Sequence, residues 1–323
     1  MAADVTAAAA AALPTDTQRI EPMDIDQFTA TLLFKQHFGM DIDRTFAEDF
    51  RKLQRGMLVS ALSPSFLVTG PLRFITARVL GLLAGVDVAG MPRRRAKLLP
   101  KLSAALKAKF GERYNQLSTD QQKLVVSGFL DSMVFAGGQM VPTLIKSALA
   151  TLYSADSKAR TVPPGGVKLS EDNAEIFALE MVRFVPQAFQ VNAINPAPKP
   201  GKAEHEAAVV AAAGFDKTVW SEDAFSFSLS RADADYERLS VAFAEPAKCP
   251  HSAKDSRNCP AKSLALAMLT AYLKRFAVVS GAAGSGGDAA AAWECSVAPD
   301  KLDLGESFVT SDVFTLTRLS APS

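Results

Sequence analysis

The sequence predicts a mainly α-helical fold with small β-sheets, in the α+β class, from two patterns and their order. Apolar residues recur three and four positions apart from residue 23 to about residue 152, and prolines punctuate this stretch. Short alternating segments at 224–229 and 312–319 indicate strands. We therefore expect a single domain over residues 23–323, with a helical part at 23–190 and a mixed part at 191–323.

Two helices in the second half have clear boundaries in the sequence. Ser170, Glu171, Asp172 and Asn173 offer N-cap candidates for a helix that runs to about Phe184, before a proline. The segment 260–276 reads PAKSLALAMLTAYLKRF and predicts an amphipathic helix of four to five turns. Proline- and glycine-rich stretches at 161–166, 196–201 and 281–287 predict loops.

Composition narrows the class of protein. The chain has 35 basic and 34 acidic residues, and its formal net charge of +1 is too small to attract it to nucleic acid. Its three cysteines are too few for a disulfide framework, so we expect no disulfide partner. This cysteine content favours a reducing, intracellular compartment, either the cytoplasm or a plastid. Residues 1–22 form an alanine-rich stretch that fits neither a secretory signal nor a transit peptide, and we expect a disordered lead-in. The most apolar stretch, 66–90, contains arginines and a proline, so we expect no transmembrane segment.

The segment 93–113, which we predict to be a helix, carries eight basic residues against one acid, Glu112. The favoured interpretation is a solvated helix face. The alternative is a docking surface for a redox partner or for anionic lipid heads, so a peripheral membrane contact stays open.

Cys259 stands where a thiolate could serve as a metal ligand. Arg257-Asn258-Cys259-Pro260-Ala261 leads directly into the helix predicted at 260–276. The positive end of a helix dipole lowers the pKa of a nearby thiol, and such a thiolate can be the axial ligand of heme iron. Arg257 could bind a heme propionate. The alternative is a buried cysteine at a helix end. Cys249 and His251 lack the paired spacings of a structural zinc site.

Two further signals precede this cysteine. Glu180 and Arg183 lie three apart on the predicted helix and can pair, although most such pairs are surface features. Gly137 and Gly138 lie within a segment, 135–143, that we expect inside a helix. Paired glycines there mark either a bend or the close approach of something flat, and the alternative is a loose helix kinked by Pro142.

Taken in order, these motifs resemble the carboxy-terminal part of the cytochrome P450 superfamily. The resemblance rests on Glu180-Met181-Val182-Arg183, an irregular stretch at 243–246, SRNCPAKSLALAML around Cys259, and a terminal FTLTRL strand. It implies a cytochrome P450-like fold with heme b bound to Cys259, Arg257 at a propionate, and Glu180 with Arg183 as a brace against the irregular stretch. Ser252, Asp255 and Ala261 depart from the family's usual phenylalanine and glycines.

The glycine segment resembles the allene oxide synthase and hydroperoxide lyase branch of that superfamily. Oxygen-activating members carry an acid and a threonine after this glycine, whereas this chain has Gln139, Met140 and Val141. The resemblance implies that heme cleaves the O–O bond of a fatty-acid hydroperoxide, after which the lipid rearranges to an epoxide or splits. It gives Gly137, Gly138 and Gln139 the catalytic positions. An acyl chain would contact an apolar wall made of Phe135, Ala136, Met140 and Val141.

Two alternatives remain at this stage. One is a cytochrome P450 monooxygenase that uses dioxygen and a reductase. The other is a non-catalytic remnant, because the family's amino-terminal third has no counterpart here and we expect a truncated fold. Substrate identity, product, compartment and oligomeric state are not specified by these residues.

Overall fold

The chain forms two compact units in the computed structural model. The first comprises residues 1–12 and 21–142, and the second comprises residues 13–20 and 143–323. This boundary differs from the division at residue 190 that we expected within a single domain. The structure describes residues 2–62, 71–83, 85–134, 138, 140–153, 169–184, 190–194, 205–209, 217–220, 224, 226–231, 261–281, 293–296 and 314–319.

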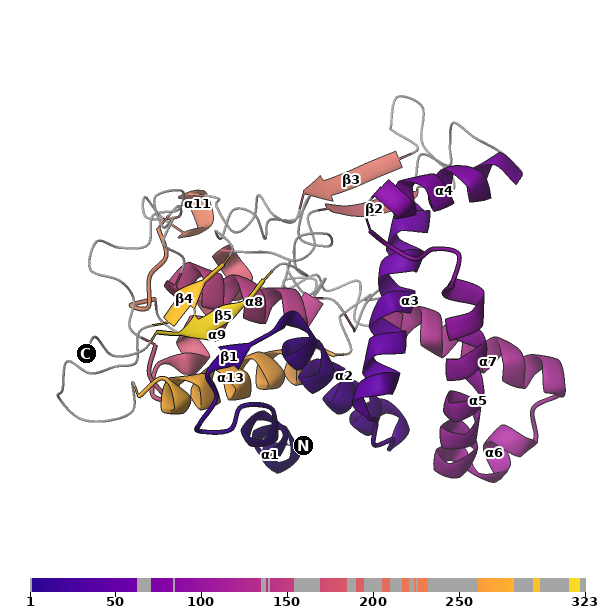
Figure 1. The fold of residues 1–323 in the computed structure, drawn as a ribbon, viewed down its shortest axis with the longest axis horizontal. Helices are drawn as coiled ribbons and strands as arrows, with labels where there is room; N and C mark the ends of the chain where they lie inside the picture. Colours follow the sequence, from indigo (N-terminus) through magenta and orange to yellow (C-terminus); the bar gives the residue numbers. More distant parts are fainter. Residues whose placement is uncertain are drawn as a thin grey trace. The chain divides into compact units, whose positions relative to one another are not determined.

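The first unit is helical, as the spacing of its apolar residues predicts (Figure 1). Its helices are α1 (Ala2–Ala12), α2 (Pro22–Phe38), α3 (Arg44–Leu62), α4 (Pro71–Leu83), α5 (Met91–Phe110), α6 (Glu112–Asn115) and α7 (Thr119–Ser132). Capping sets several ends. The backbone N–H of Glu21 donates to the Asp24 side chain at 2.9 Å, and Gly39 ends α2 with a φ of 68° that favours glycine.

The expectation of a disordered lead-in at residues 1–22 is wrong. Residues 2–12 form α1, and Arg19–Ile20 form strand β1. Alanine has the highest helix propensity, so a run of alanines becomes helical once one face finds a contact. Val5 and Ala9 are each 1% exposed, and α1 packs against α2.

Aromatic residues dominate the core of the first unit. The ring of Phe34 packs edge-on against Phe46 and Phe50, with 4.9 Å between centroids in each case. Leucines from α5 and α7 complete this core: Leu98, Leu102, Leu106 and Leu130. The residues come from four helices, so the packed core holds α2, α3, α5 and α7 together.

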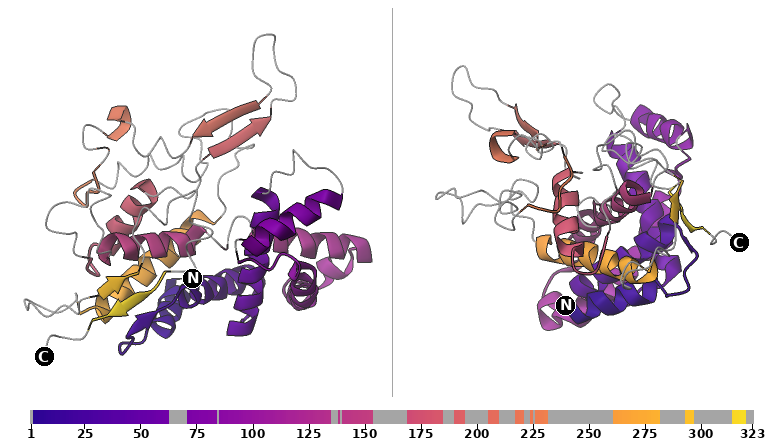
Figure 2. Two further views of the ribbon diagram at one scale, coloured as in Figure 1. Left: turned by 45° about the horizontal axis from the view of Figure 1, so that its top comes forward. Right: turned by 90° about the vertical axis from the view of Figure 1, so that its left-hand side faces the viewer.

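The second unit combines helices with two small sheets. Its helices are α8 (Met140–Tyr153), whose first turn begins at the unit boundary, α9 (Ala174–Phe184), α11 (Lys217–Trp220) and α13 (Lys262–Val279). Strands β2 (Gln190–Ile194) and β3 (His205–Val209) form an antiparallel hairpin, whose strands run side by side in Figure 2. The other sheet has the order β1–β5–β4, with β4 at Trp293–Cys295 and β5 at Leu316–Arg318.

The three-stranded sheet joins the two ends of the chain. Ile20 of β1 and Cys295 of β4 both pair with Leu316 of β5 in antiparallel register. The strand expected at 312–319 therefore exists, although only its residues 316–318 are regular strand. Since β5 lies between two partners, its backbone groups are paired on both sides.

Helices α9 and α13 pack against each other and form the core of the second unit. On α13, the ring of Phe276 lies 5.5 Å from Tyr153 of α8 and 5.4 Å from Trp293 of β4. Burial raises the pKa of the Tyr153 hydroxyl, and a hydrogen bond with Ser280 partly opposes that rise. The helix expected to run from the N-cap candidates at 170–173 to about Phe184 is confirmed as Ala174–Phe184. The helix expected at 260–276 is confirmed as Lys262–Val279, with its end three residues later than predicted.

Candidate functional site

Glu180 and Arg183 of α9 form a fully buried ion pair. Their spacing of three places both on one helix face. Arg183 Nε donates to Glu180 Oε2 at 2.8 Å, and Arg183 Nη2 donates to Oε1 at 2.5 Å. Both side chains are 0% exposed. Most Glu and Arg pairs with this spacing lie on the protein surface, but this one does not. Its two parallel N–H···O bonds form a bidentate pair, which is a strong type of charge-assisted hydrogen bond.

Arg183 also donates hydrogen bonds to the backbone of a segment about 40 residues further along the chain. Arg183 Nη1 donates to the carbonyl oxygen of Ala224, and Nη2 donates to that of Ser226, each at 2.7 Å. The backbone N–H of Ser228 donates to Glu180 Oε1 at 2.9 Å. Alternate backbone groups of this segment are thus satisfied by two charged side chains.

This capture explains why the strand expected at 224–229 is wrong. The described residues of that segment, Ala224 and 226–231, form turns and bends. Alternation of apolar and polar residues is real, since Phe227 is 1% exposed while Ser226 is exposed. The carbonyl and amide groups that a neighbouring strand would have bonded are instead bonded to Glu180 and Arg183.

Arg231 is the third member of this network, and sequence reasoning missed it. Its Nε donates to Glu180 Oε1 at 3.4 Å, and its Nη2 donates to the Ser226 carbonyl at 3.2 Å. The expected partner of the Glu180–Arg183 brace was the stretch 243–246, which lies outside the described residues. The only signal in the sequence was the positive charge of Arg231, because a contact over 51 residues has no local pattern.

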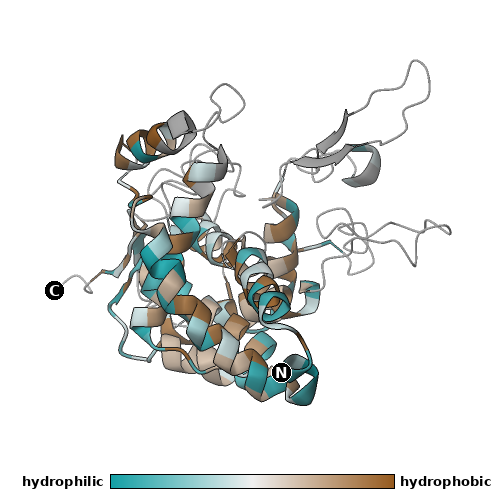
Figure 3. Ribbon diagram, turned by 90° about the vertical axis from the view of Figure 1, so that its right-hand side faces the viewer, coloured by the Kyte–Doolittle hydropathy of each residue, from teal (hydrophilic) through white to brown (hydrophobic). Residues whose placement is uncertain are grey.

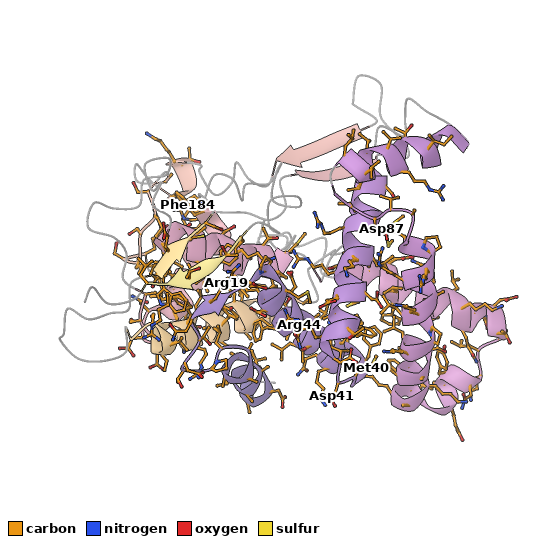
Figure 4. The ribbon with its side chains drawn as sticks, in the orientation of Figure 1. Arg19, Met40, Asp41, Arg44, Asp87 and Phe184 are labelled. Atoms are coloured by element: carbon orange, nitrogen blue, oxygen red, sulfur yellow. The ribbon has the colours of Figure 1, made fainter. Side chains whose placement is uncertain are left out.

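An aromatic shell surrounds the charges. The Trp220 ring faces both guanidinium groups, at 5.2 Å from Arg183 and 5.7 Å from Arg231. Phe227 packs between Phe177 and Phe184, whose position at the end of α9 is labelled in Figure 4. Among the described residues, the network combines one carboxylate with two guanidinium groups, and the electron-rich face of Trp220 lies against both guanidinium groups.

The hydrogen bonds of the network hold a shape. Glu180 accepts bonds from Arg183, from the backbone N–H of Ser228 and from Arg231. What the geometry can do is fix the path of residues 224–231 against α9. We refer to Glu180, Arg183 and Arg231 together as the buried charge network.

The second part of the candidate site is the amino-terminus of α13. The helix begins at Lys262 with Ala261 as N-cap, and no side chain of the described residues caps it. Cys259 stands two positions before that N-cap. Unpaired N–H groups and the helix dipole at such a position favour an anionic thiolate. Cys259 and Arg257 themselves lie outside the described residues.

Gly138 of the glycine segment, 135–143, is not inside a helix as we expected. Residues 133 and 134 continue α7 as a wider helical turn, Gly138 lies in a bend, and α8 begins at Met140. The Gly138 N–H donates to the Met133 carbonyl at 2.9 Å, a bond that spans five residues and widens the end of α7. Pro142 lies in the first turn of α8, where proline is tolerated, so it does not kink a helix.

Close packing explains the need for glycine at position 138. A methyl group there would lie 1.8 Å from Nε2 of Gln54 and 2.9 Å from a ring carbon of Phe50. Side chains of α3 therefore make a close approach at Gly138, where we expected a bend or the approach of a flat group. Gln54 is itself 3% exposed and donates to the Val134 carbonyl at 3.4 Å.

The other predicted pocket residues are only partly described. Val141 is 4% exposed and Met140 is 39% exposed, so the two neighbours differ in burial. Phe135, Ala136, Gly137 and Gln139 lie outside the described residues. Among the described part of the chain, no group of three or more His, Cys, Asp or Glu side chains could hold a metal ion. Likewise, none of the described helices has the length and apolar character needed to cross a bilayer.

Comparison with known proteins gives a result only at the level of structure. No protein-family model matches the sequence, and no curated protein sequence matches it either. Three solved structures illustrate the similarity, all cytochromes P450. The open form of EryK from S. erythraea is 15% identical with a TM-score of 0.57, over 99% of this chain and 75% of that one.

The other two agree with it. CREJ in complex with (4-ethylphenyl) dihydrogen phosphate is 12% identical with a TM-score of 0.58, over 98% of this chain and 72% of that one. P450BioI, in complex with acyl carrier protein ligated to hexadec-9Z-enoic acid, is 11% identical with a TM-score of 0.54, over 92% of this chain and 69% of that one. At these identities the likeness establishes the fold alone. This chain has the cytochrome P450 fold.

Proposed function

We propose that this chain binds heme b through the thiolate of Cys259 and converts a fatty-acid hydroperoxide by cleaving its O–O bond without a reductase. The observation that carries the proposal is the cytochrome P450 fold combined with a cysteine two residues before the N-cap of α13. The buried charge network supports it as a counterpart of the brace that the resemblance implies, because Glu180 and Arg183 pair and hold residues 224–228 against α9.

The residues present fit a heme-thiolate group. The α13 amino-terminus has no capping side chain among the described residues, so its N–H groups can stabilise a negative sulfur. Arg257, two residues before Cys259, carries the cation that a propionate needs. Once bound, such a heme supplies an iron centre that can cleave a peroxide O–O bond homolytically.

The reaction type follows from what the glycine segment lacks. Delivery of protons to bound dioxygen needs an acidic side chain near the metal, and the residues after Gly138 are Gln139 and Met140. Neither side chain is an acid. A hydroperoxide carries its own oxidising O–O bond, so dehydration to an epoxide or splitting of the carbon chain needs no external electrons. In this proposal Gly137, Gly138 and Gln139 lie at the reacting group.

An acyl chain is the substrate class that the apolar residues favour. Val141 is buried, and Phe135, Ala136 and Met140 would add apolar surface to the same wall. P450BioI, which has the same fold, was solved in complex with acyl carrier protein ligated to hexadec-9Z-enoic acid. That complex supports the capacity of the fold for a long acyl chain, and we extend it to this chain as part of the proposal.

The second candidate function is a monooxygenase that uses dioxygen and an electron-transfer partner. It is favoured by the same fold, which does not separate the two reactions. The two functions differ in their requirements: the first needs only the hydroperoxide, whereas the second needs dioxygen and reducing equivalents. A non-catalytic relative would bind no heme.

The test is an anaerobic assay with linoleic acid hydroperoxide, the heme-loaded protein and no reductase, following the loss of conjugated-diene absorbance. We expect turnover by the wild type, and a rate at the level of free heme for Cys259→Ser. Turnover that appears only with dioxygen and a reductase would replace this proposal by the monooxygenase. A folded protein that takes up no heme would contradict both.

A further inference from the structure

Gln54 of α3 is a buried amide that bonds to another helix. In Figure 3, hydrophobic and hydrophilic residues are interspersed along the helices of the first unit, so polar side chains there have an outer face to occupy. Among the described residues of that unit, two non-aromatic polar side chains are nevertheless buried, Thr29 at 2% and Gln54 at 3% exposure. The Thr29 hydroxyl donates within its own helix, to the carbonyl oxygens of Ile25 and Asp26. Gln54 instead donates to the carbonyl oxygen of Val134, 80 residues away in the sequence.

The Val134 carbonyl lacks the donor that a regular helix would give it. In an α-helix it would accept a hydrogen bond from the N–H of residue 138, four positions later. The N–H of Gly138 donates instead to the carbonyl oxygen of Met133, five positions away, at 2.9 Å. Val134 is 0% exposed, so bulk water cannot replace that donor, and an unpaired buried carbonyl group is costly. Gln54 Nε2, at 3.4 Å from the Val134 carbonyl oxygen, supplies a bond in its place.

The amide group of Gln54 fits here because Gly138 has no side chain. A Cβ atom on Gly138 would lie 1.8 Å from Gln54 Nε2 and 2.9 Å from Gln54 Cδ. The backbone conformation does not itself demand glycine, because Gly138 does not have a positive φ. The close approach of Gln54, together with that of Phe50, is therefore what requires glycine at this position.

A side chain that enters the hydrogen-bond ladder of a helix interrupts that helix, and wide turns of this kind are frequent at functional sites. The interruption falls at Gly138, which the proposed function places at the reacting group. We propose that Gln54 is a positioning residue for that reaction: its side-chain amide replaces the hydrogen bond that α7 loses at Val134, and so fixes the bend at Gly138. Its role in the reaction rests on the proposed function, whereas its contact with Gly138 does not.

Gln54→Met tests the role in the reaction, because methionine has a similar length but no N–H to donate. In the anaerobic assay with linoleic acid hydroperoxide we expect kcat to fall about tenfold and KM to change less than about threefold, since a shifted bend misplaces the reacting group and leaves the acyl-chain contacts in place. Leu53→Met is the matched control, because Leu53 is 1% exposed next to Gln54 in α3, and it should keep both constants. The spectrum of the reduced carbonyl form should be that of the wild type in both variants. An unchanged kcat in Gln54→Met would overturn the positioning role.

Urea unfolding of the heme-free full chain tests the contact without any reaction. Gly138→Ala is made in the wild type and in Gln54→Ala, where the clash with Nε2 is removed. Residues in contact have effects on stability that do not add. We expect Gly138→Ala to change the equilibrium constant of unfolding about fivefold less, or better, in the Gln54→Ala background than in the wild type. Equal effects of Gly138→Ala in the two backgrounds would overturn the contact.

The two experiments separate the ways in which the proposals can fail. Turnover by the wild type with the same kcat in Gln54→Met contradicts the positioning role and leaves the proposed function standing. No turnover by the wild type contradicts the proposed function, and with it the role of Gln54 in the reaction, while the unfolding experiment still decides the contact with Gly138. A fall in kcat for Gln54→Met, together with unequal effects of Gly138→Ala in the two backgrounds, is the result that we expect.

Discussion

The ion pairs described in the two units differ in how deeply they are buried. In the first unit, Arg95 and Asp131 pair with side chains that are 27% and 39% exposed, and Asp87 in its pair with Arg94 is 56% exposed. In the second unit, Glu180 and Arg183 are 0% exposed, and Arg231 is 7% exposed. Ion pairs on the surface contribute little to the free energy of unfolding, whereas buried charges need oppositely charged or hydrogen-bonding partners. The described pairs of the first unit all keep some exposure, down to 13% and 14% for Arg51 and Asp26, whereas the charges of Glu180 and Arg183 are part of the core of the second unit.

The comparison predicts its largest effect at Glu180. Replacing it by glutamine keeps the shape but removes the buried carboxylate that Arg183 and Arg231 both contact, so we expect the free energy of unfolding to fall by about 3–5 kcal/mol. The backbone N–H of Ser228 and both guanidinium groups would also lose bonds to a carboxylate. Urea unfolding of the heme-free protein measures this change. A decrease of less than about 1 kcal/mol in the free energy of unfolding would show that burying these charges costs little.

A smaller effect is expected from Gly138→Ala, because the added methyl group meets Gln54 and Phe50, which are both buried. We expect a loss of about 1–3 kcal/mol from overpacking. Gly128→Ala is the matched control, since Gly128 lies within α7 and a methyl group there meets nothing within 4 Å. That control should gain up to about 1 kcal/mol from helix propensity. Equal effects of the two substitutions would refute the close approach at Gly138.

The surface pair gives the counterpart of the Glu180 experiment. Asp131→Asn removes a half-exposed partner of Arg95, and we expect a loss of about 0–1 kcal/mol that shrinks at high salt. The same urea experiment measures it. A loss as large as that of Glu180→Gln would erase the distinction between the two units.

The smallest effect concerns His37 at the end of α2. Burial, and then the charge of Lys109, hold the pKa of His37 below its ordinary value of 6.5. A lowered pKa means that the folded state favours neutral imidazole, so its contribution is intact above 6.5 and is lost as pH falls toward the folded pKa.

Comparing the urea midpoints at about pH 8 and about pH 5 tests this direction. The wild type should lose more stability at the lower pH than His37→Gln, which cannot titrate. Lys109→Met should narrow the difference, although this lysine also donates to the carbonyl oxygens of Gln36 and His37. An identical pH response of wild type and His37→Gln would contradict the lowered pKa.

Local patterns predicted the parts of the fold that depend on local physics. Helices α9 and α13 follow from apolar spacing and boundary residues, and the Glu180–Arg183 contact follows from a spacing of three. Two expectations failed where tertiary contacts decide. The alanine-rich residues 2–12 form a helix because Val5 and Ala9 are buried where α1 packs against α2. The segment 224–229 does not form the expected strand because side chains of α9 bond its backbone groups.

Long-range partners had no signal in the sequence. Arg231 reaches Glu180 over 51 residues, and Gln54 reaches Val134 over 80. Neither contact belongs to a periodic pattern, because each depends on how separate elements pack. The roles of Cys259, Arg257 and the glycine segment remain predictions from motif order, which the cytochrome P450 fold supports without testing each residue.

The measurement that tests the heme-thiolate proposal most directly is an absorption spectrum of the protein supplied with heme, then reduced under carbon monoxide. A thiolate ligand shifts the Soret band of the reduced carbonyl form to long wavelength, and we expect that shifted band in the wild type. It should be absent in Cys259→Ser, while Cys295→Ser should keep it as the matched control. A normal band position in the wild type, or a shifted band that survives in Cys259→Ser, would contradict the assignment of Cys259 as the iron ligand.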